Sequence, residues 1–302
     1  MRDTFVKTLI KLAKQDKSIE LITGDLGFGV LKPFWEQCPD QFTNAGIAEQ
    51  NMTSVAAGMA LEGKTVFTYS IGNFSTLRCL EQIRNDCAYH NANVKVVCIG
   101  GGFVYGSLGM SHHATEDLAV MRALPNIVVM APADLVEAEE CTKALAEYKG
   151  TAYLRLGRGG EKRIHERIDN FQIGNAIKVH DGNDVVIFST GAIFEEVTAA
   201  YDELIKRGYN PAVYTFPTIK PIDSDVIRNA ARSFDMIVTV EEHNIVGGFG
   251  SAVAEVMAEM SDKKAKLVRI GLNDEYCIKV GNQKYLRQQY GINSEGIVNA
   301  II

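Results

Sequence analysis

The sequence has 302 residues, of which 46% are hydrophobic and 23% are charged, and this composition is typical of a globular protein long enough to form two domains. Its net charge of −6 at pH 7 and the absence of any basic block argue against binding to nucleic acid or to an anionic membrane. We therefore expect small molecules or other proteins as partners.

Apolar runs typical of buried strands alternate with segments of helical periodicity in the first half of the chain. The predicted strands are residues 18–25, 64–70, 94–100, 126–132 and 152–158, and the predicted helices are 1–15, a segment that starts near Ala45 and runs through Glu49 to Leu61, and 76–89. This alternation indicates a mostly parallel sheet with crossover helices.

A polar stretch with few apolar residues, 159–170, follows and is interpreted as a linker. A second series comes after it, with predicted strands at 184–190, 211–217, 236–242 and 266–272 and predicted helices at 194–206, 224–233 and 252–260. We therefore predict an α/β fold of two domains, residues 1–165 and 180–302, each with a mostly parallel sheet and crossover helices.

The six cysteines lack paired CxxC spacing, and no signal peptide precedes them, so we expect reduced thiols and a cytoplasmic protein. No apolar run approaches the roughly 18 residues that a membrane-spanning helix needs, so we expect no membrane span.

Glu49 lies in the segment TNAGIAEQNM, where small residues such as Ala48 and Ala56 favour close packing of the predicted helix. A buried carboxylate in such a position is costly unless it has a partner. The local pattern alone allows a second interpretation, that Glu49 faces solvent or caps the helix.

Four segments resemble the carboxyl-terminal half of transketolases in order and spacing. They are GIAEQNM, FSTLRCLEQIRND, SHHATEDLAVMRALPNIVVMAPAD and VEEHNIVGGFGSAVAE. The chain is most similar to the small subunit of split transketolases, which depend on thiamine diphosphate. Deoxyxylulose-phosphate synthases and the β subunits of 2-oxoacid dehydrogenases are more distant relatives. The resemblance implies that residues 1–165 form a pyrimidine-binding domain and residues 180–302 a transketolase C-terminal domain.

The resemblance also implies roles for individual residues. Glu49 matches the catalytic glutamate that hydrogen-bonds N1′ of the cofactor's aminopyrimidine and so promotes proton removal from the thiazolium ring. Phe74 matches an aromatic residue that stacks on the pyrimidine. Ile71 and Leu77 match two further aromatic positions, so the cofactor pocket is expected to be apolar but less aromatic than in typical transketolases. Phe74 could instead be an ordinary core residue.

His112 matches a histidine that lies over the reacting carbons, where a neutral imidazole can hydrogen-bond a substrate oxygen and move a proton. The alternative is a capping or core histidine. Before this histidine the family has a Glu-Asp pair, and this chain has Ser107 and Leu108 in its place. In the family, the aspartate of the pair recognises a hydroxyl of the donor ketose. The preference for a donor sugar is therefore expected to differ.

Arg158 and Arg2 match two arginines that hold a sugar phosphate in transketolases, a role suited to the planar guanidinium group. Gly100 and Gly29 stand where the family has a histidine and a serine, so the phosphate could be held differently or be absent. Either arginine could also be simply solvated. Asp25 matches an aspartate that approaches the cofactor from a neighbouring subunit, and its alternative role is that of a turn or N-cap residue.

The family motif G-D-G, which binds Mg²⁺ and the diphosphate through hard oxygen ligands, has no counterpart at a suitable position. HDGND at 180–184 lies in the wrong domain, and VGGFGSA at 246–252 lacks the full frame of a nucleotide-binding loop. We therefore expect no metal ligands in this chain. A larger subunit is expected to supply the Mg²⁺ and diphosphate site in an α2β2 heterotetramer with a homodimeric contact.

Three function classes follow. The first is the small subunit of a split transketolase, which moves a two-carbon ketol unit from a ketose donor to an aldose acceptor. The second is the β subunit of a 2-oxoacid or acetoin dehydrogenase, or a deoxyxylulose-phosphate-synthase-like enzyme. The third is a non-catalytic assembly subunit. The sequence does not specify the sugars, or whether they are phosphorylated or nucleotide-linked.

Overall fold

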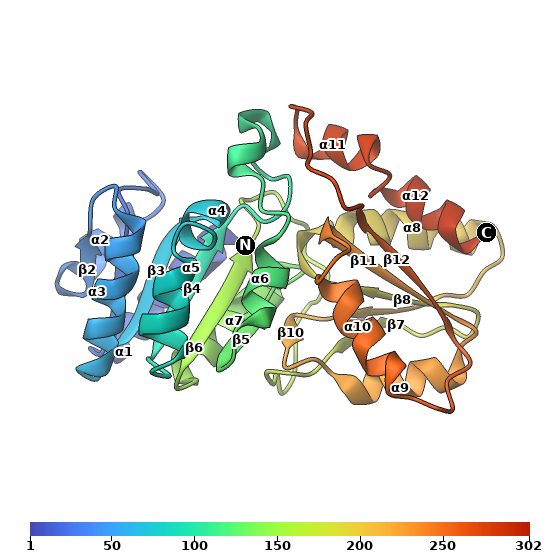
Figure 1. Ribbon diagram of the computed structural model, residues 1–302, viewed down its shortest axis with the longest axis horizontal. Helices are drawn as coiled ribbons and strands as arrows, with labels where there is room; N and C mark the ends of the chain where they lie inside the picture. The colour runs from blue at the N-terminus through green and yellow to red at the C-terminus, as the bar shows by residue number, and fades with distance from the viewer.

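Seven strands form the first sheet in the computed structural model, which describes residues 1–302 (Figure 1). Their order is β10-β5-β6-β4-β3-β1-β2. The bounds are β1 Ile19–Thr23, β2 Phe42–Asn44, β3 Thr65–Ile71, β4 Val94–Ile99, β5 Ile127–Met130, β6 Thr151–Leu156 and β10 Thr218–Lys220. All pairs are parallel except β10 with β5. The central strands are buried on both faces, as expected for continuous apolar runs in a parallel sheet.

Helices cover both faces of this sheet because successive strand residues point to opposite sides. Leu21 packs with α1 (Arg2–Gln15), α2 (Lys32–Gln37) and α7 (Leu135–Glu147), whereas Ile22 packs with the opposite set. That second set is α3 (Glu49–Leu61), α5 (Leu80–Gln82) with the π-helix that continues it (Ile83–Ala88), and α6 (Asp117–Ala123). The short helix α4 (Gly72–Ser75) follows β3 directly.

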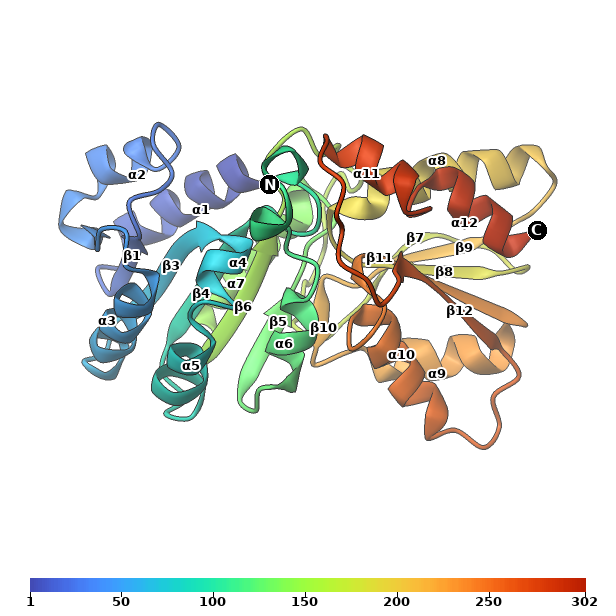
Figure 2. The same ribbon diagram turned by 45° about the horizontal axis from the view of Figure 1, so that its top comes forward.

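The second sheet has five strands in the order β12-β11-β8-β9-β7. Their bounds are β7 Ile177–His180, β8 Val186–Ser189, β9 Ala212–Thr215, β11 Met236–Asn244 and β12 Lys266–Leu272, and only β7 is antiparallel to its neighbour. Apolar side chains of α8 (Phe194–Lys206) and α12 (Ser294–Ile301) pack on one face, and those of α9 (Ser224–Ser233) and α10 (Phe249–Ala258) on the other. The helix α11 (Gln283–Gln289) lies beyond this layer, near the first domain (Figure 2).

A strand and an apolar cluster join the two domains at their boundary. Strand β10 comes from the second half of the chain but pairs with β5 of the first sheet, and Figure 2 shows it between the two sheets. One apolar cluster includes Val129 and Tyr153 of the first sheet together with Phe216 and Phe249 of the second domain. The core therefore runs through both domains.

The α/β class and most element positions agree with the sequence-based prediction, but several boundaries differ. Helix α3 begins at Glu49 and not near Ala45, because Gly46 has a φ of +73° and its N–H is bound to Asn44 Oδ1. The predicted helix 76–89 begins at Leu80. The short strands β2, β7 and β10 were not predicted, because three or four residues carry too little periodicity. No helix combines the length and apolar character needed to cross a membrane.

Candidate active site

The predicted site residues follow strands whose carboxyl ends meet at one edge of the first sheet. Asp25 follows β1, Ile71 ends β3, the loop 100–116 follows β4, and Arg158 follows β6. These four strands are parallel, so their carboxyl ends form a common edge, which is where open α/β sheets present ligand sites.

Glu49 is the first residue of α3 and only 3% of it is exposed. Its Oε2 accepts a charge-assisted hydrogen bond from Arg78 Nη1 at 2.8 Å, whereas its Oε1 accepts no hydrogen bond from the chain. A Cβ at Gly24, after β1, would lie 3.3 Å from the Glu49 Cγ, so this glycine lets the carboxylate approach the sheet edge. The interpretation of Glu49 as a solvent-facing residue is therefore wrong.

Arg78 connects Glu49 to Phe74. Its guanidinium carbon lies 4.4 Å from the centre of the Phe74 ring, and the edge-to-face contact between Phe74 and His112 has a centroid distance of 5.1 Å. The residues Glu49, Arg78, Phe74 and His112 thus form one continuous line of contacts. Arg78 was not predicted as a site residue, although its position four residues after Phe74 in a helical pattern could have indicated a shared face.

His112 lies in a turn, Met110–His112, and is partly exposed. Its Nδ1 is 3.0 Å from Ser111 Oγ, so the serine hydroxyl can fix the orientation of the ring. The neighbouring His113 is buried against Phe103, and burial lowers its pKa. Of the two histidines, His112 is the one that reaches the line of contacts.

The Tyr105 ring lies between one predicted arginine, Arg158, and His112. The Arg158 guanidinium carbon lies 5.5 Å from the Tyr105 ring centre, and that ring is 6.4 Å from the His112 ring. Burial raises the pKa of Tyr105, while the positive charges of Arg158 and Arg2 oppose this rise. No sequence pattern pointed to Tyr105.

The Tyr105 ring also explains a departure from the family pattern. Gly100 has a φ of +90°, and a side chain there would collide with the Tyr105 ring. The space that a histidine at this position would need is filled by Tyr105. Leu108, at the other departure, is 55% exposed at the end of the turn Gly106–Leu108.

Asp25 has a φ of +57° and forms a reciprocal pair with Asn44. Its backbone N–H donates to Asn44 Oδ1 at 3.0 Å, and its Oδ1 accepts from Asn44 Nδ2 at 2.9 Å. Asp25 therefore serves as a turn residue here, and it is partly exposed. Ile71, partly buried, precedes α4, and Leu77, next to Arg78 in the sequence, is exposed.

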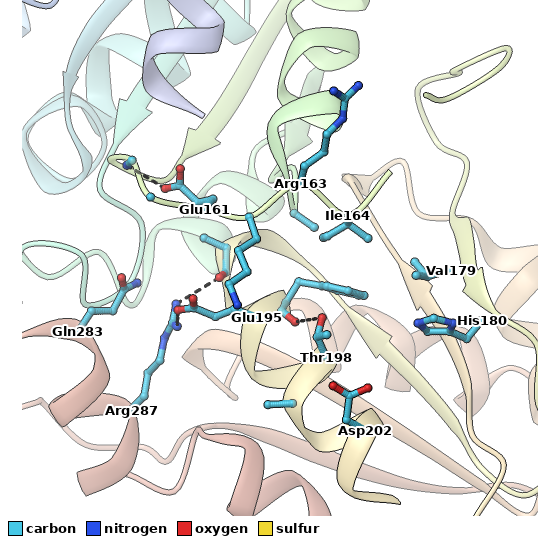
Figure 3. A pocket seen from close by; sticks show the side chains of 17 residues that line it. Glu161, Arg163, Ile164, Val179, His180, Glu195, Thr198, Asp202, Gln283 and Arg287 are labelled. Atoms are coloured by element: carbon cyan, nitrogen blue, oxygen red, sulfur yellow. Dashed lines mark hydrogen bonds and ion pairs between the residues drawn. The ribbon is translucent and has the colours of Figure 1, made fainter. Parts of the chain in front are cut away.

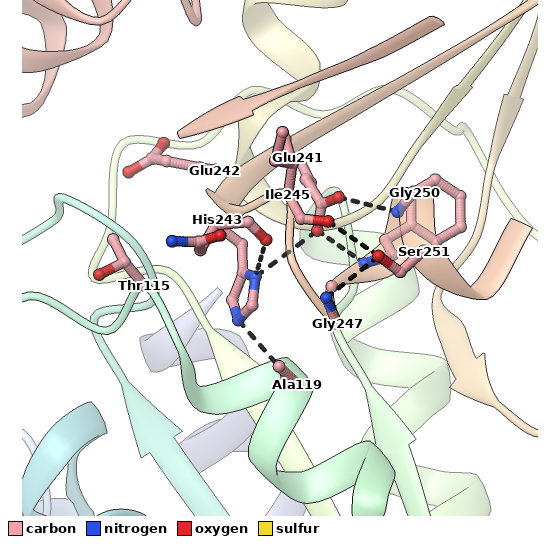
Figure 4. Close-up of polar contacts among 12 residues, drawn as sticks. Thr115, Ala119, Glu241, Glu242, His243, Ile245, Gly247, Gly250 and Ser251 are labelled. Atoms are coloured by element: carbon pink, nitrogen blue, oxygen red, sulfur yellow. Dashed lines mark hydrogen bonds and ion pairs between the residues drawn. The ribbon is translucent and has the colours of Figure 1, made fainter. Parts of the chain in front are cut away.

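The two segments that resemble ligand-binding motifs, HDGND and VGGFGSA, have structural roles. HDGND forms the turn between β7 and β8. In VGGFGSA, the first N–H groups of α10 are already bound, since Phe249 N and Gly250 N donate to Glu241 at 2.6 and 2.8 Å (Figure 4). Burial raises the pKa of Glu241 to about 7, although these two N–H groups favour the carboxylate.

A group of possible metal ligands, Asp134, Glu137 and His165, lies within 4.8 Å in the boundary between the domains. Asp134 Oδ1 caps α7, and its Oδ2 accepts from the backbone N–H groups of Ile164 and His165. Glu137 accepts from Ala133 N at 2.6 Å and from His165 Nε2 at 3.0 Å. These oxygens are engaged by donors of the chain, so the cluster fastens the linker to α7.

A separate cavity of about 520 Å³ lies between the linker residues 159–164, α8 and α11 (Figure 3). Its lining carries both charges, including Glu195, Asp202 and Arg287. None of the predicted site residues lines it, so the candidate active site is the sheet edge around Glu49 and not this cavity.

The residues at the sheet edge fit the aminopyrimidine of thiamine diphosphate. The free Oε1 of the buried Glu49 can accept a hydrogen bond, and the Phe74 ring offers an apolar face beside it. Arg78 covers this face, but it is 46% exposed and so has room to move outward.

Comparisons with known proteins identify the family of the chain. Residues 1–160 match the family description "Transketolase, pyrimidine binding domain", and residues 174–297 match "Transketolase, C-terminal domain". A protein of Methanocaldococcus jannaschii, provisionally named a transketolase C-terminal section, is 40% identical over 100% of this chain and 95% of its own length. One of the subunits of the apulose-4-phosphate transketolase of Phocaeicola vulgatus is 36% identical over 98% of this chain and 94% of its own length.

A solved structure described as a split gene transketolase, inactive β4 tetramer, is 34% identical to this chain with a TM-score of 0.91. It aligns over 99% of this chain and 96% of its own. The matches cover 95%, 94% and 96% of the lengths of these three relatives. The chain therefore belongs to the transketolase family, as a chain composed of the pyrimidine-binding and carboxyl-terminal domains of that family.

Proposed function

We propose that this chain is the small subunit of a split, thiamine-diphosphate-dependent transketolase, which moves a two-carbon ketol unit from a ketose donor to an aldose acceptor. The observation that carries the proposal is the line of contacts Glu49–Arg78–Phe74–His112 at the carboxyl edge of the first sheet. This line combines a buried carboxylate, an aromatic face and an imidazole within one continuous surface, as the family chemistry requires.

Thiamine diphosphate, when bound, supplies a carbon nucleophile that can accept and release a ketol unit. Glu49 would hold a proton at N1′ of the aminopyrimidine, and its burial would keep that hydrogen bond free of competing water. Phe74 would hold the ring by stacking without competing for its proton. Ile71 would add an apolar contact, and Asp25 would approach the cofactor of a neighbouring subunit.

His112 would hydrogen-bond an oxygen of the substrate and exchange a proton with it during carbon–carbon bond cleavage and formation. Ser111 fixes the Nδ1 side of its ring, which leaves Nε2 for the substrate. Arg158, whose guanidinium lies over the Tyr105 ring, and Arg2 would bind the phosphate of a sugar phosphate.

A larger subunit with the G-D-G motif would supply Mg²⁺ and the diphosphate site, in an α2β2 heterotetramer with a homodimeric contact. Large apolar side chains beside the site support an interface there: Ile47 and Phe28 are 81% and 80% exposed. We also propose a cytoplasmic location, which the six free, buried cysteines support.

The substrate is proposed to be a specialised sugar phosphate. The relative of Phocaeicola vulgatus is named for a sugar phosphate, apulose 4-phosphate. Leu108 and Gly100 replace the polar residues that the family uses for the donor hydroxyl and the phosphate, which supports a donor of different structure.

The test is to co-express this chain with a larger subunit that carries the G-D-G motif and to present ketose donors and aldehyde acceptors, with products identified by mass spectrometry. Two-carbon transfer that is lost in a Glu49→Gln complex would support the proposal. Decarboxylation of pyruvate with acyl transfer to a lipoyl protein, or condensation of pyruvate with an aldehyde, would contradict it and favour the dehydrogenase or synthase alternative. A stable complex without turnover on any donor would favour an assembly subunit.

A further inference from the structure

The two ends of the loop that carries His112, residues 100–116, are joined by backbone hydrogen bonds. Gly102 and Ala114 form an isolated antiparallel bridge, with N–H to carbonyl distances of 2.8 and 3.0 Å. The Ala114 carbonyl also accepts from Arg155 Nη2 at 2.8 Å. The position of His112 therefore depends on what holds the two ends of this loop.

Glu242, on β11 of the second domain, binds the first end of the loop. Only 3% of Glu242 is exposed, and its Oε1 accepts from the Phe103 backbone N–H at 2.5 Å. Gly102, with a φ of +62°, passes so close that a side chain there would collide with the Glu242 carboxylate. The loop backbone thus packs directly on a carboxylate that comes from 139 residues further along the chain.

The Glu242 carboxylate is itself fixed by α11. Gln283 Nε2 donates to its two oxygens at 2.9 and 3.0 Å, and Arg287 Nε donates to Oε2 at 2.5 Å. Arg287 is buried and also pairs with Glu195. With the Phe103 N–H, the Glu242 carboxylate has three donors, so it has little freedom to rotate. The position of Phe103 therefore depends on the position of the second domain.

The rest of the loop also touches the second domain. The Thr115 carbonyl, at the other end, accepts from the Asn244 backbone N–H at 2.8 Å, two residues after Glu242 on β11. In the middle, Gly281 N donates to Gly106 O, and Leu286 of α11 leaves no space for a side chain at Gly106. The second domain therefore contacts the loop on both sides of His112.

We infer that Glu242 is a positioning residue for His112, which acts by fixing the Phe103 end of the loop through its hydrogen bond to that N–H. The inference rests on the proposed function for its catalytic consequence, since His112 acts on the substrate in that proposal. It assigns the second domain a part in the chemistry although none of its side chains belongs to the line of contacts around Glu49.

Glu241 provides a matched control. It is adjacent to Glu242 and also buried, and it accepts from two backbone N–H groups, which belong to α10 of its own domain. Figure 4 shows the two carboxylates pointing in different directions from β11, with only Glu241 directed at the start of α10. Glu241→Gln should lower stability without moving His112.

The first experiment uses the full chain alone. Glu242→Asp withdraws the carboxylate by one methylene, so the amides of Phe103 and Ala114 should exchange with solvent at least about 10-fold faster than in Glu241→Gln of matched global stability. The His112 ring C–H signal, one of only six histidine signals, should lose the ring-current shift that Phe74 causes. Unchanged exchange and an unchanged His112 signal would overturn the inference.

The second experiment uses the complex with the larger subunit and cofactor. Because a displacement near 1 Å can cost roughly 100-fold in rate, Glu242→Asp should lower kcat by about 10- to 100-fold with little change in KM. If the wild-type complex transfers no ketol unit while the His112 signal still responds to Glu242→Asp, the proposed function fails and the positioning role stands. A normal kcat in Glu242→Asp would overturn the role.

Gly102→Ala tests the same contact from the loop side if Glu242→Asp does not fold. The added methyl group collides with the Glu242 carboxylate and is strained at a φ of +62°, while no donor of the second domain is substituted. It should displace the His112 signal in the same way, and an unmoved signal in a folded Gly102→Ala chain would contradict the inference.

Discussion

Glu49 is a buried carboxylate whose partner in the chain is a half-exposed arginine. Leaving a buried charge without a partner is costly, so Arg78 stabilises Glu49 in the free chain. The Arg78 guanidinium is planar, binds Glu49 Oε2 and covers the Phe74 face. An aminopyrimidine that binds the free Oε1 of Glu49 would stack on the same Phe74 face, so the cofactor and Arg78 should compete for the space over this ring.

Substitution of Glu49 tests its proposed role directly. Glu49→Gln should keep the fold and the complex with the larger subunit but slow proton loss from C2 of the thiazolium ring by about 10²- to 10⁴-fold, because an amide hydrogen-bonds without exchanging the proton. Deuterium exchange at C2 in the reconstituted complex measures this step. Equal exchange in both proteins would mean that Glu49 is purely structural.

Arg78→Met should change two quantities in opposite directions. The free chain should unfold at a lower temperature, because Glu49 loses its partner. The reconstituted complex should bind thiamine diphosphate more tightly, on the order of several-fold, because no ion pair has to be broken first. Thermal unfolding and calorimetric titration measure the two effects.

Arg84→Met is the control for this pair, since Arg84 is exposed and donates only to the adjacent Asn85. It should leave both quantities unchanged. Weaker cofactor binding in Arg78→Met would show that Arg78 remains at the cofactor and contributes to its binding.

At the scale of elements, the linker predicted at 159–170 has neither helix nor strand, yet it is fastened to α7. Asp134 binds two backbone N–H groups of the linker, and Glu137 binds His165. Burial lowers the pKa of His165, but the hydrogen bond to Glu137 and the charges of Glu137 and Asp134 outweigh it and hold the pKa above its usual value.

This shift predicts a dependence of stability on pH. The folded state binds the His165 proton more tightly than the unfolded state, so the stabilisation is complete below the ordinary pKa near 6.5 and is lost as pH rises through the raised value. His165→Gln keeps a donor but carries no charge. It should therefore lower the free energy of unfolding more at about pH 5.5 than at about pH 8.5, as measured by urea titration.

His90→Gln is the control, because His90 is exposed and its ring packs edge-to-face with that of Tyr89. It should show no such difference between the two pH values. An equal loss of stability at both pH values in His165→Gln would show that the charge of His165 does not stabilise the linker.

At the scale of the whole molecule, the shared core and β10 join the two domains, while the edge around Glu49 carries exposed apolar side chains. The chain holds residues suited to the pyrimidine half of the cofactor. The isolated chain should therefore bind thiamine diphosphate weakly and show no turnover, whereas addition of the larger subunit should restore both. Calorimetry measures this, and tight stoichiometric binding by the chain alone would refute the prediction.

The sequence by itself determined the α/β class, most strands and helices, and the family. Periodicity identifies strands such as β4 and helices such as α8, because each element of this length buries a regular pattern of side chains. Glu49, Phe74 and His112 were identified through the resemblance to transketolases, and their catalytic roles stay predictions. The start of α3 was misplaced, because the positive φ of Gly46 is a property of the folded turn.

Only the tertiary structure decided which other residues meet at the site. Arg78 lies 29 residues from Glu49 in sequence, and Glu242 lies 139 residues from Phe103. Tyr105 fills the space at Gly100 because of the path of its loop. Periodicity reports which face of one element is buried, but contacts between distant segments depend on tertiary packing. Packing within the first domain brings Arg78 to Glu49 and Tyr105 to Gly100, and packing of the two domains brings Glu242 to Phe103.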